Sequence, residues 1–421
     1  MYITLPGQTA PVTAGRFQLT VDRTGTPVGR FVYGRSYLDR GEAVEIDPVE
    51  LKLARGTTYE TAGMKGVFGA LRDAGPDYWG RAVIERHVGK APLGELDYLL
   101  ESPDDRAGAL GFGLGPEPPA PRRQFNQTIE LEKLQKIADA LIEDENKKPA
   151  DAKAAQVQEL LLIATSMGGA RPKAVVEDKD GLWLAKFNTA HDRWNVARVE
   201  HTMLTLARTC GLSVADSRVT EVGGRDVLLV KRFDRSKTDG GYLRGRMVSA
   251  LTLLRADDTH NTRERWSYVL LAEELRRITA EPQRHAHELF RRMVFNGLIS
   301  NTDDHPRNHA ALALNDSWAL SPAYDLTPTS PVSVERRDLA LICGDAGRYA
   351  NAQNMLSQCG RFLLARDEAL AMIDQMRTAV RTHWYASLRA QGVSERECAL
   401  LSGAFVYEGF DLPLLNGEPL A

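Results

Sequence analysis

Long apolar runs are absent from this sequence of 421 residues, and this absence limits where the protein can reside. No stretch approaches the roughly 18 consecutive apolar residues that a membrane-spanning helix requires. The start, Met1–Gln8, also lacks the basic segment followed by an apolar core that marks a secretion signal. We therefore expect a cytoplasmic protein without a membrane anchor.

Cysteine and excess positive charge are scarce as well. Cys210, Cys343, Cys359 and Cys398 lie far apart and form no C-x-x-C pair, which excludes a zinc knuckle and a disulfide framework. The formal net charge is -3, unlike that of a polycationic nucleic-acid binder. No basic helix-turn-helix pattern is present either, so we expect any contact with DNA to be made through a partner.

Proline and glycine divide the chain into parts. The first part alternates short apolar strands such as Arg16–Val21 and Gly29–Tyr33 with turns, which predicts a small α+β module. Four prolines fall within Gly115–Arg123, a composition typical of an extended connector. We therefore predict an N-terminal module over residues 1–115, a part with a glycine loop over 116–235, and a mostly helical part over 236–421.

A glycine loop followed by a β-hairpin opens the middle of the chain. Ser166–Lys173 contains the loop, and Ala174–Asp178 and Leu182–Phe187 are predicted strands joined by a tight turn at Asp180–Gly181. A helix from Trp194 to Thr209 is expected next. Further predicted helices are Thr128–Asp144, Ala152–Ile163, Arg246–Leu254, Arg263–Ile278, Gln283–Ser300, Asp367–Gln391 and Glu395–Val406.

The polar stretch Asn301–Asn308 holds the strongest candidates for chemistry. Asp303 and Asn308 stand five residues apart, and Asp325 follows after an apolar passage and a turn. A carboxylate can accept the proton of a substrate hydroxyl, and carboxylate and amide oxygens suit magnesium bound together with phosphates. From the residues alone, Asp304 is an equal candidate for the base. The alternative is an Asx turn with solvated side chains.

Two histidines of this stretch suggest a competing metal site. His305 and His309, together with aspartates, are residues that zinc or iron hydrolases use. Two histidines so close on one loop nevertheless lack a third well-placed nitrogen or sulfur ligand. We therefore favour the magnesium site.

Basic residues around the hairpin predict phosphate contacts. Lys186 lies in a strand of apolar residues, where a buried ammonium needs an anionic partner; Glu200, on the next helix, is either that partner or an ordinary surface residue. Gly168 and Gly169 let backbone amides approach a phosphate, and nearby Arg171 and Lys173 add positive charge. The chain has no G-x-x-x-x-G-K-[ST] motif, and this region has no G-x-G-x-x-G, which distinguishes it from Walker ATPases and ordinary protein kinases.

Several motifs, in their order, resemble those of the HipA-like serine/threonine kinases, the toxins of bacterial type II toxin–antitoxin pairs. The motifs are Pro76–Arg81, Asp104–Phe112, Ser166–Lys173, Lys231–Arg235, Asn301–Asn308 and Tyr324–Asp325. The resemblance covers nearly the whole chain. It implies a small N-terminal α+β module followed by a bilobal protein-kinase-like fold, with a mixed α/β N-lobe to residue 235 and a helical C-lobe.

The resemblance also implies ATP and Mg²⁺ as cofactors and assigns roles to residues. Asp303 rather than Asp304 becomes the base, Asn308 and Asp325 become the metal ligands, and Ser166 becomes a site of autophosphorylation that can hold the loop away from ATP. The residues implied to contact the nucleotide are Gly168, Gly169, Ala170, Arg171, Lys173, Lys186, Lys231, Phe233, His305, Asn308, Tyr324 and Asp325.

Partners follow from the same resemblance. It implies a DNA-binding antitoxin of the HipB type, held with the help of the first domain, and a translation-related protein substrate, with an aminoacyl-tRNA synthetase as the best candidate. The sequence departs from ordinary kinases, since Asn-Thr-Asp303 replaces His-Arg-Asp and Asp325-Leu-Thr replaces Asp-Phe-Gly, so their activation-loop switching does not transfer. Two alternatives remain, a small-molecule or lipid-headgroup kinase and a nucleotide-sensing corepressor without essential catalysis.

Overall fold

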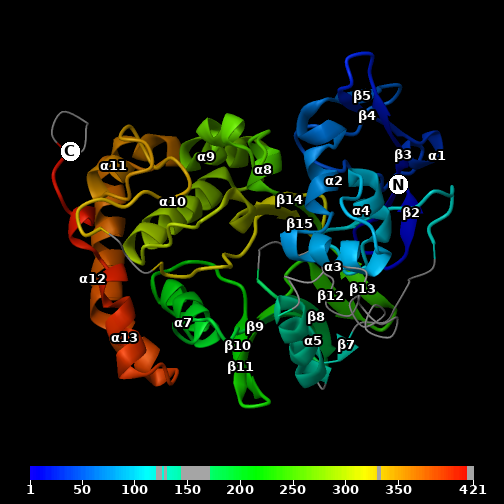
Figure 1. The fold of residues 1–421 in the computed structure, drawn as a ribbon. Helices are drawn as coiled ribbons and strands as arrows, with labels where there is room; N and C mark the ends of the chain where they lie inside the picture. Colours follow the sequence, from blue (N-terminus) through cyan, green and yellow to red (C-terminus); the bar gives the residue numbers. More distant parts are fainter. Residues whose placement is uncertain (120–125, 128–129, 144–170, 330–332, 415–421) are drawn as a thin grey trace. The chain divides into compact units, whose positions relative to one another are not determined.

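The computed structural model describes residues 1–119, 126–127, 130–143, 171–329 and 333–414 (Figure 1). Two compact units make up the chain. Unit 1 contains Met1–Thr189, Glu221–Thr252 and Leu312–Trp318, and unit 2 contains Ala190–Thr220, Leu253–Ala311 and Ala319–Ala421. The chain mixes helices and strands, as predicted. Ser166, Gly168, Gly169, Ala170 and the predicted helix Ala152–Ile163 lie outside the described residues.

The N-terminal part of unit 1 contains two small sheets. Strands β3 (Gly15–Val21) and β4 (Pro27–Tyr33) form the predicted antiparallel hairpin. The Asp22 side chain stabilises its turn by accepting hydrogen bonds from the backbone amides of Thr24 and Thr26. The other strands are β5 (Tyr59–Thr61) beside β4, and β2 (Pro11–Thr13), β1 (Tyr2–Thr4) and β6 (Leu110–Gly111) in the second sheet.

Helices complete this part of unit 1. The Asp77 side chain caps α3 (Tyr78–Val88) by accepting a hydrogen bond from Gly80 N at 2.6 Å, and the left-handed Gly89 ends the helix. The shorter helices are α1 (Arg35–Leu38), α2 (Gly69–Asp73) and α4 (Glu95–Glu101).

The main sheet of unit 1 follows the order β11 (Arg225–Lys231), β9 (Gly181–Phe187), β8 (Lys173–Asp178) and β7 (Asn126–Gln127), and the last residues of β10 (Ser217–Val222) lie beside β11. The predicted β8–β9 hairpin is confirmed, and Gly181 adopts a φ of +120° at its turn. Alternate residues of the strands pack against α3 and α5 (Leu131–Glu143), through apolar side chains that include Trp79, Leu134, Trp183 and Phe187.

One predicted helix of this unit is wrong. Residues 246–254 form the strand β14 (Arg246–Ser249) followed by the single turn α8 (Ala250–Leu253). Distant partners explain the difference, because the Arg246 guanidinium donates to the carbonyl oxygens of Glu45 and Asn315, which a local pattern does not reveal. The hairpin β12 (Arg235–Thr238) and β13 (Gly241–Arg244) precedes β14.

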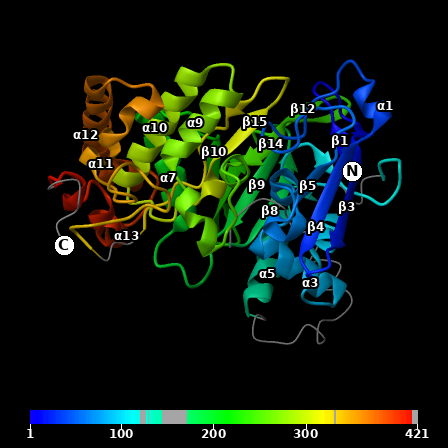
Figure 2. The same cartoon turned by 90° about the horizontal axis from the view of Figure 1, so that it is seen from above.

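Unit 2 is mainly helical. The long helix α10 (Pro282–Leu298) packs against α9 (Tyr268–Ile278) and α12 (Arg366–Ala390), and α12 also packs against α7 (Val196–Thr209) (Figure 2). Shorter elements are α11 (Ala352–Ser357), α13 (Glu395–Leu401), η5 (His260–Arg265), η7 (Cys359–Phe362), η8 (Ser402–Ala404) and η9 (Glu408–Phe410). Within the described parts of the chain, no helix is long and apolar enough to cross a membrane.

The predicted continuous helix from Arg263 to Ile278 is interrupted. Ser267 is extended and caps α9 through its hydroxyl, which accepts a hydrogen bond from Leu270 N at 3.3 Å. The backbone on either side of Ser267 bonds to Ile342, far along the chain. This pairing separates η5 from α9 at a position where the sequence pattern alone continues the helix.

Candidate active site

The polar loop of unit 2 follows the end of α10. Ser300 adopts a left-handed φ of 54°, and the chain then passes through η6 (Pro306–Asn308), which His305 caps by accepting a hydrogen bond from Arg307 N on its Nδ1. Strands β15 (Ala310–Ala313) and β16 (Ala319–Leu320) come next. Buried elements therefore flank the loop on both sides, which fixes where its side chains emerge.

The two neighbouring aspartates of this loop have opposite environments. Asp304 is 1% exposed, and its Oδ2 accepts hydrogen bonds from the Tyr268 hydroxyl and, at 2.7 Å, from His309 Nε2. Asp303 is exposed. Of the two carboxylates, that of Asp303 is accessible and that of Asp304 is enclosed, and the role of Asp303 as the base stays a prediction.

Asp325 lies close enough to Asp303 to act on it electrostatically. The pKa of the Asp303 carboxyl is raised, mainly because the group is partly buried. The negative charges of Asp325 and Asp304 raise this pKa further. Asp325 has a left-handed φ of 59°, an uncommon conformation for a residue other than glycine. Ala323, two residues earlier, is fixed by backbone hydrogen bonds with Ser213 and Ala215. The fold therefore holds two acidic groups together, a pairing that a divalent cation relieves.

Asn308 belongs to the same turn. Its backbone N donates to His305 O at 2.7 Å, and its side chain is half-buried. An amide oxygen on this loop and the Asp325 carboxylate supply the hard oxygen donors that Mg²⁺ takes up, so these residues fit the metal that the sequence implies. The specific ligand set stays a prediction.

His305 lies in a partly apolar setting. Burial is the main cause that lowers its pKa to about 4, since the ring packs edge-on against Trp266 at 4.5 Å and the attraction of Asp258 only partly offsets burial. His305 is therefore neutral at pH 7. Among the residues that the structure describes, no group of three or more His, Cys, Asp or Glu side chains is arranged to hold a metal ion. Tyr324 donates its hydroxyl to Arg307 O at 2.6 Å, at the edge of the same turn.

In unit 1, Lys186 and Lys173 are directly paired across β9 and β8. Lys186 is the one residue of β9 that is not buried. Lys173 is buried, and its Nζ lies 2.7 Å from Asp77 Oδ2, so this carboxylate accounts for its charge without a nucleotide. The ion pair argues for a structural role of Lys173, and its predicted role in cofactor binding stays a prediction. Glu200 is buried on α7 of unit 2, and its predicted pairing with Lys186 also stays a prediction.

The segment Lys231–Arg235 contains a buried ionic cluster that the sequence did not reveal. Asp234 accepts hydrogen bonds from Arg232, from Arg235 and, at 2.9 Å, from Gly108 N. Burial alone would raise the pKa of Asp234, but the two guanidinium groups outweigh it and hold the pKa well below its ordinary value. The guanidinium groups also donate to the carbonyl oxygens of residues 105 and 106, so two of the family motifs meet in space.

The other predicted nucleotide contacts around this cluster are more exposed. The ammonium of Lys231 lies 5.8 Å from the centre of the Trp183 ring, directly across the sheet, and Phe233 is half-buried. Arg171, at the edge of the described chain, is exposed. Their contacts with a nucleotide stay predictions.

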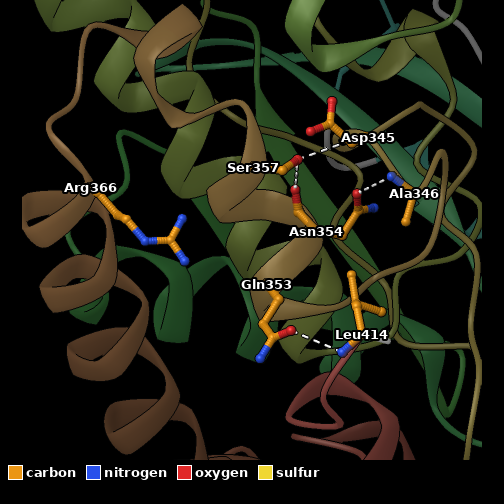
Figure 3. A pocket seen from close by; sticks show the side chains of 7 residues that line it. All are labelled: Asp345, Ala346, Gln353, Asn354, Ser357, Arg366 and Leu414. Atoms are coloured by element: carbon orange, nitrogen blue, oxygen red, sulfur yellow. Dashed lines mark hydrogen bonds between the residues drawn. The ribbon is translucent and has the colours of Figure 1, made fainter. Parts of the chain in front are cut away.

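A cavity of about 350 Å³ elsewhere in unit 2 is of a different kind (Figure 3). Its lining groups mostly bond to one another, since Ser357 Oγ accepts from Asp345 N at 2.9 Å and Gln353 Oε1 accepts from Leu414 N at 2.9 Å. The residues predicted for catalysis are not among its lining residues, which are Asp345, Ala346, Gln353, Asn354, Ser357, Arg366 and Leu414.

Comparison with known proteins identifies the family. The family model described as the HipA-like C-terminal domain matches residues 165–384. The Sinorhizobium fredii (strain NBRC 101917 / NGR234) protein named "Putative kinase Y4mE" is 26% identical over 329 residues, which cover 74% of each chain. HipA of Shewanella oneidensis MR-1, solved as a complex with HipB and its operator DNA, matches with a TM-score of 0.66 at 16% identity over 96% of this chain and 95% of that chain, which shows a shared fold. Since the family model spans more than half of the sequence, the chain belongs to the HipA-like C-terminal domain family.

Proposed function

We propose that the chain is an ATP- and Mg²⁺-dependent serine/threonine protein kinase that acts as the toxin of a toxin–antitoxin pair. One observation carries the proposal: Asp303 is exposed within electrostatic reach of Asp325, while the adjacent Asp304 is enclosed. The S. fredii relative, named "Putative kinase Y4mE", and the fold shared with HipA support the same proposal. Serine and threonine hydroxyls are the groups that an exposed carboxylate of this kind can deprotonate.

Four side chains have a role in the proposed reaction. Asp303 orients the substrate hydroxyl and accepts its proton, while the oxygen atoms of Asn308 and Asp325 would hold the metal ion. When bound, ATP supplies the phosphoryl group and Mg²⁺ neutralises the charge of its phosphates. Lys186 would add a positive charge at the phosphates. The chain would thus contribute positioning and charge rather than a covalent intermediate.

Further nucleotide contacts are part of the proposal. Gly168, Gly169, Ala170 and Arg171 would offer backbone amides and positive charge to the phosphates, and the backbone from Lys231 to Phe233 would contact adenine. His305 and Tyr324 would border the nucleotide. Lys173 would contribute less to nucleotide binding, because its charge is already balanced by Asp77.

We also propose that Ser166 is phosphorylated by the same chain. A phosphate at this position would add about -1.5 to -2 charges and would hold the glycine loop away from the nucleotide. The protein substrate would be a translation-related protein, with an aminoacyl-tRNA synthetase as the first candidate.

A partner of the HipB type is proposed from the similar structure, which contains HipA, HipB and operator DNA. Residues 1–115 would help to hold this antitoxin. The net charge of -3 favours indirect rather than direct contact of this chain with DNA.

Incubation with labelled ATP tests the proposal. Transfer of label to the chain, lost in Ser166→Ala and in Asp303→Asn, is the expected result. Label found only on an added small molecule or lipid headgroup would support the alternative kinase class. If Asp303→Asn leaves growth arrest and operator repression intact, the chain is instead a nucleotide-sensing corepressor.

A further inference from the structure

The polar loop repeats one arrangement at its two ends. Asp303 is followed by Asp304, and Asn308 is followed by His309. In each pair the first residue is exposed or half-buried and the second is buried, with 1% of Asp304 and 2% of His309 exposed. In each pair the buried second residue fixes the backbone next to the more accessible first residue, which is Asp303 in a turn and Asn308 at the end of η6.

The two buried neighbours bond to each other. His309 Nε2 donates to Asp304 Oδ2 at 2.7 Å, and the Tyr268 hydroxyl donates to the same oxygen. Burial and the Asp304 carboxylate raise the pKa of Tyr268, so its hydroxyl keeps the proton that it donates. The His309 ring also packs edge-on against the Tyr268 ring at 5.5 Å. These three side chains close the loop across the residues between 304 and 309.

The start of the loop is joined to the same cluster. Asn296 Nδ2 donates to the Tyr268 hydroxyl oxygen at 3.1 Å, and Asn301 Nδ2 donates to Asn296 Oδ1 at 3.1 Å. The backbone N of Asn301 also donates to Asn296 O at 2.8 Å. Both asparagines are buried. The beginning, middle and end of the loop are therefore bonded, directly or in sequence, to α9 and α10.

A role in packing alone does not explain this cluster well. Among the described residues, Asp304 forms no ion pair with a lysine or arginine, and its Oδ1 has no hydrogen-bond partner. A buried carboxylate that is paired with a histidine ring, and not with a lysine or arginine, costs free energy that an apolar side chain would avoid. The polar cluster instead fixes the orientation of the loop, because hydrogen bonds are directional and apolar contacts are not.

We propose that Tyr268, Asp304 and His309 are positioning residues that set the spacing and outward direction of Asp303 and Asn308. The effect that we expect on catalysis rests on the proposed function, in which Asp303 is the base and Asn308 is a metal ligand. The loop is then held in its working geometry before nucleotide or substrate binds, and the cost of ordering it is met during folding.

Tyr268→Phe is the sharpest test, because it removes one hydroxyl and leaves the ring in place. Tyr407→Phe is the matched control in the same unit, since Tyr407 is also buried and donates its hydroxyl at 2.7 Å to a carbonyl oxygen, that of Ala350. We expect both variants to show a similar fall in Tm. Only Tyr268→Phe should lower kcat, by about 10-fold or more, with the KM for ATP changed less than about twofold.

A second readout needs no activity. Amide hydrogen exchange at His305 and Asn308, whose N–H groups bond to Asp303 O and His305 O at 2.7 Å, should accelerate about 10-fold in Tyr268→Phe and remain unchanged in Tyr407→Phe. Asp304→Ala should produce a larger change of the same kind if it folds. Unchanged exchange together with unchanged kcat in Tyr268→Phe would overturn the proposal while leaving the kinase function in place. If the native chain transfers no phosphate but exchange responds as expected, the kinase function fails and the positioning of the loop stands.

Discussion

Lys173 and Lys186 face each other across strands β8 and β9, and the Lys173 ammonium lies 2.7 Å from a buried carboxylate, that of Asp77. Residues directly opposite in an antiparallel pair project from the same face of a sheet, where two like charges repel. The Asp77 carboxylate reduces this repulsion by neutralising the charge of Lys173. The side chain of Lys186, which is the only partly exposed residue of its strand, then becomes the better candidate for a phosphate.

Methionine substitutions should separate the two lysines. Lys173→Met removes the buried ion pair with Asp77 and should cost about 3–5 kcal/mol of unfolding free energy while affinity for Mg²⁺-ATP is retained. Lys186→Met should weaken that affinity by about 10- to 100-fold with little loss of stability. Urea unfolding and calorimetric titration measure the two quantities, and each variant controls for the other. The reverse pattern would assign the nucleotide to Lys173.

Replacing the proposed base should abolish transfer without abolishing binding. Asp303→Asn keeps the size of the side chain but cannot accept the hydroxyl proton, so we expect phosphate transfer to fall by about 10²–10⁴-fold. Nucleotide affinity should change only a few-fold. Asp367→Asn, at another exposed aspartate of unit 2, is the control and should behave like the native chain. An active Asp303→Asn variant would remove this residue from the mechanism.

The ionic cluster around Asp234 should be essential for stability. Asp234→Asn removes the main counter-charge of the buried Arg232 and Arg235, which should cost about 3–5 kcal/mol. Asp338→Asn, at the exposed ion pair with Arg336, should cost less than about 1 kcal/mol. Urea unfolding of both variants compares the two costs. Equal losses of unfolding free energy in the two variants would mean that burial does not make the ionic cluster more important for stability than an exposed ion pair.

The buried carboxyl group of Asp47 should make the stability of unit 1 depend on pH. Burial raises its pKa from 3.8 to about 6, although its Oδ1 accepts hydrogen bonds from the backbone of Val49 and Glu50. Between these two values the folded chain holds a proton that the unfolded chain has released. The resulting stabilisation is present at low pH and is lost as the pH rises through about 6.

Asparagine at position 47 tests this dependence. It retains the acceptor oxygen and does not titrate, so Asp47→Asn should be more stable than the native chain at pH 7.5, by up to about 3 kcal/mol, and the gap should shrink towards pH 4. Thermal unfolding across this range measures the effect. The exposed Asp39→Asn should leave the curve unchanged. A gap that is constant with pH would contradict the assigned pKa.

Local patterns predicted much of the fold. The β8–β9 hairpin, α7 and α12 were expected within a few residues of where they occur, because their turns, caps and apolar spacing are encoded in neighbouring residues. Strand β14 and the break before α9 were missed, because both depend on partners far along the chain. Sequence periodicity contains no information about such partners.

The roles predicted for the residues of the candidate site stay predictions. The nearness of Asp303 and Asp325 agrees with the expected order of residues. The family resemblance chose Asp303 over Asp304, but the different environments of the two side chains were not predictable, because they depend on Tyr268 of α9, which was not singled out. The polar doublets Asp303–Asp304 and Asn308–His309 were the available signal, since a polar residue that becomes buried beside apolar strands needs a hydrogen-bond partner within the fold.

The contacts of Asp234 with residues 105–108 have a practical consequence for anyone who shortens this protein. Removing residues 1–115 would take away the carbonyl oxygens that accept from Arg232 and the amide of Gly108 that donates to Asp234. A chain starting at residue 116 should therefore fail to fold, as circular dichroism would reveal. Residues 105–108 therefore support the segment Lys231–Arg235 from within the fold, and the part of the chain that contains them cannot be treated as a detachable adaptor.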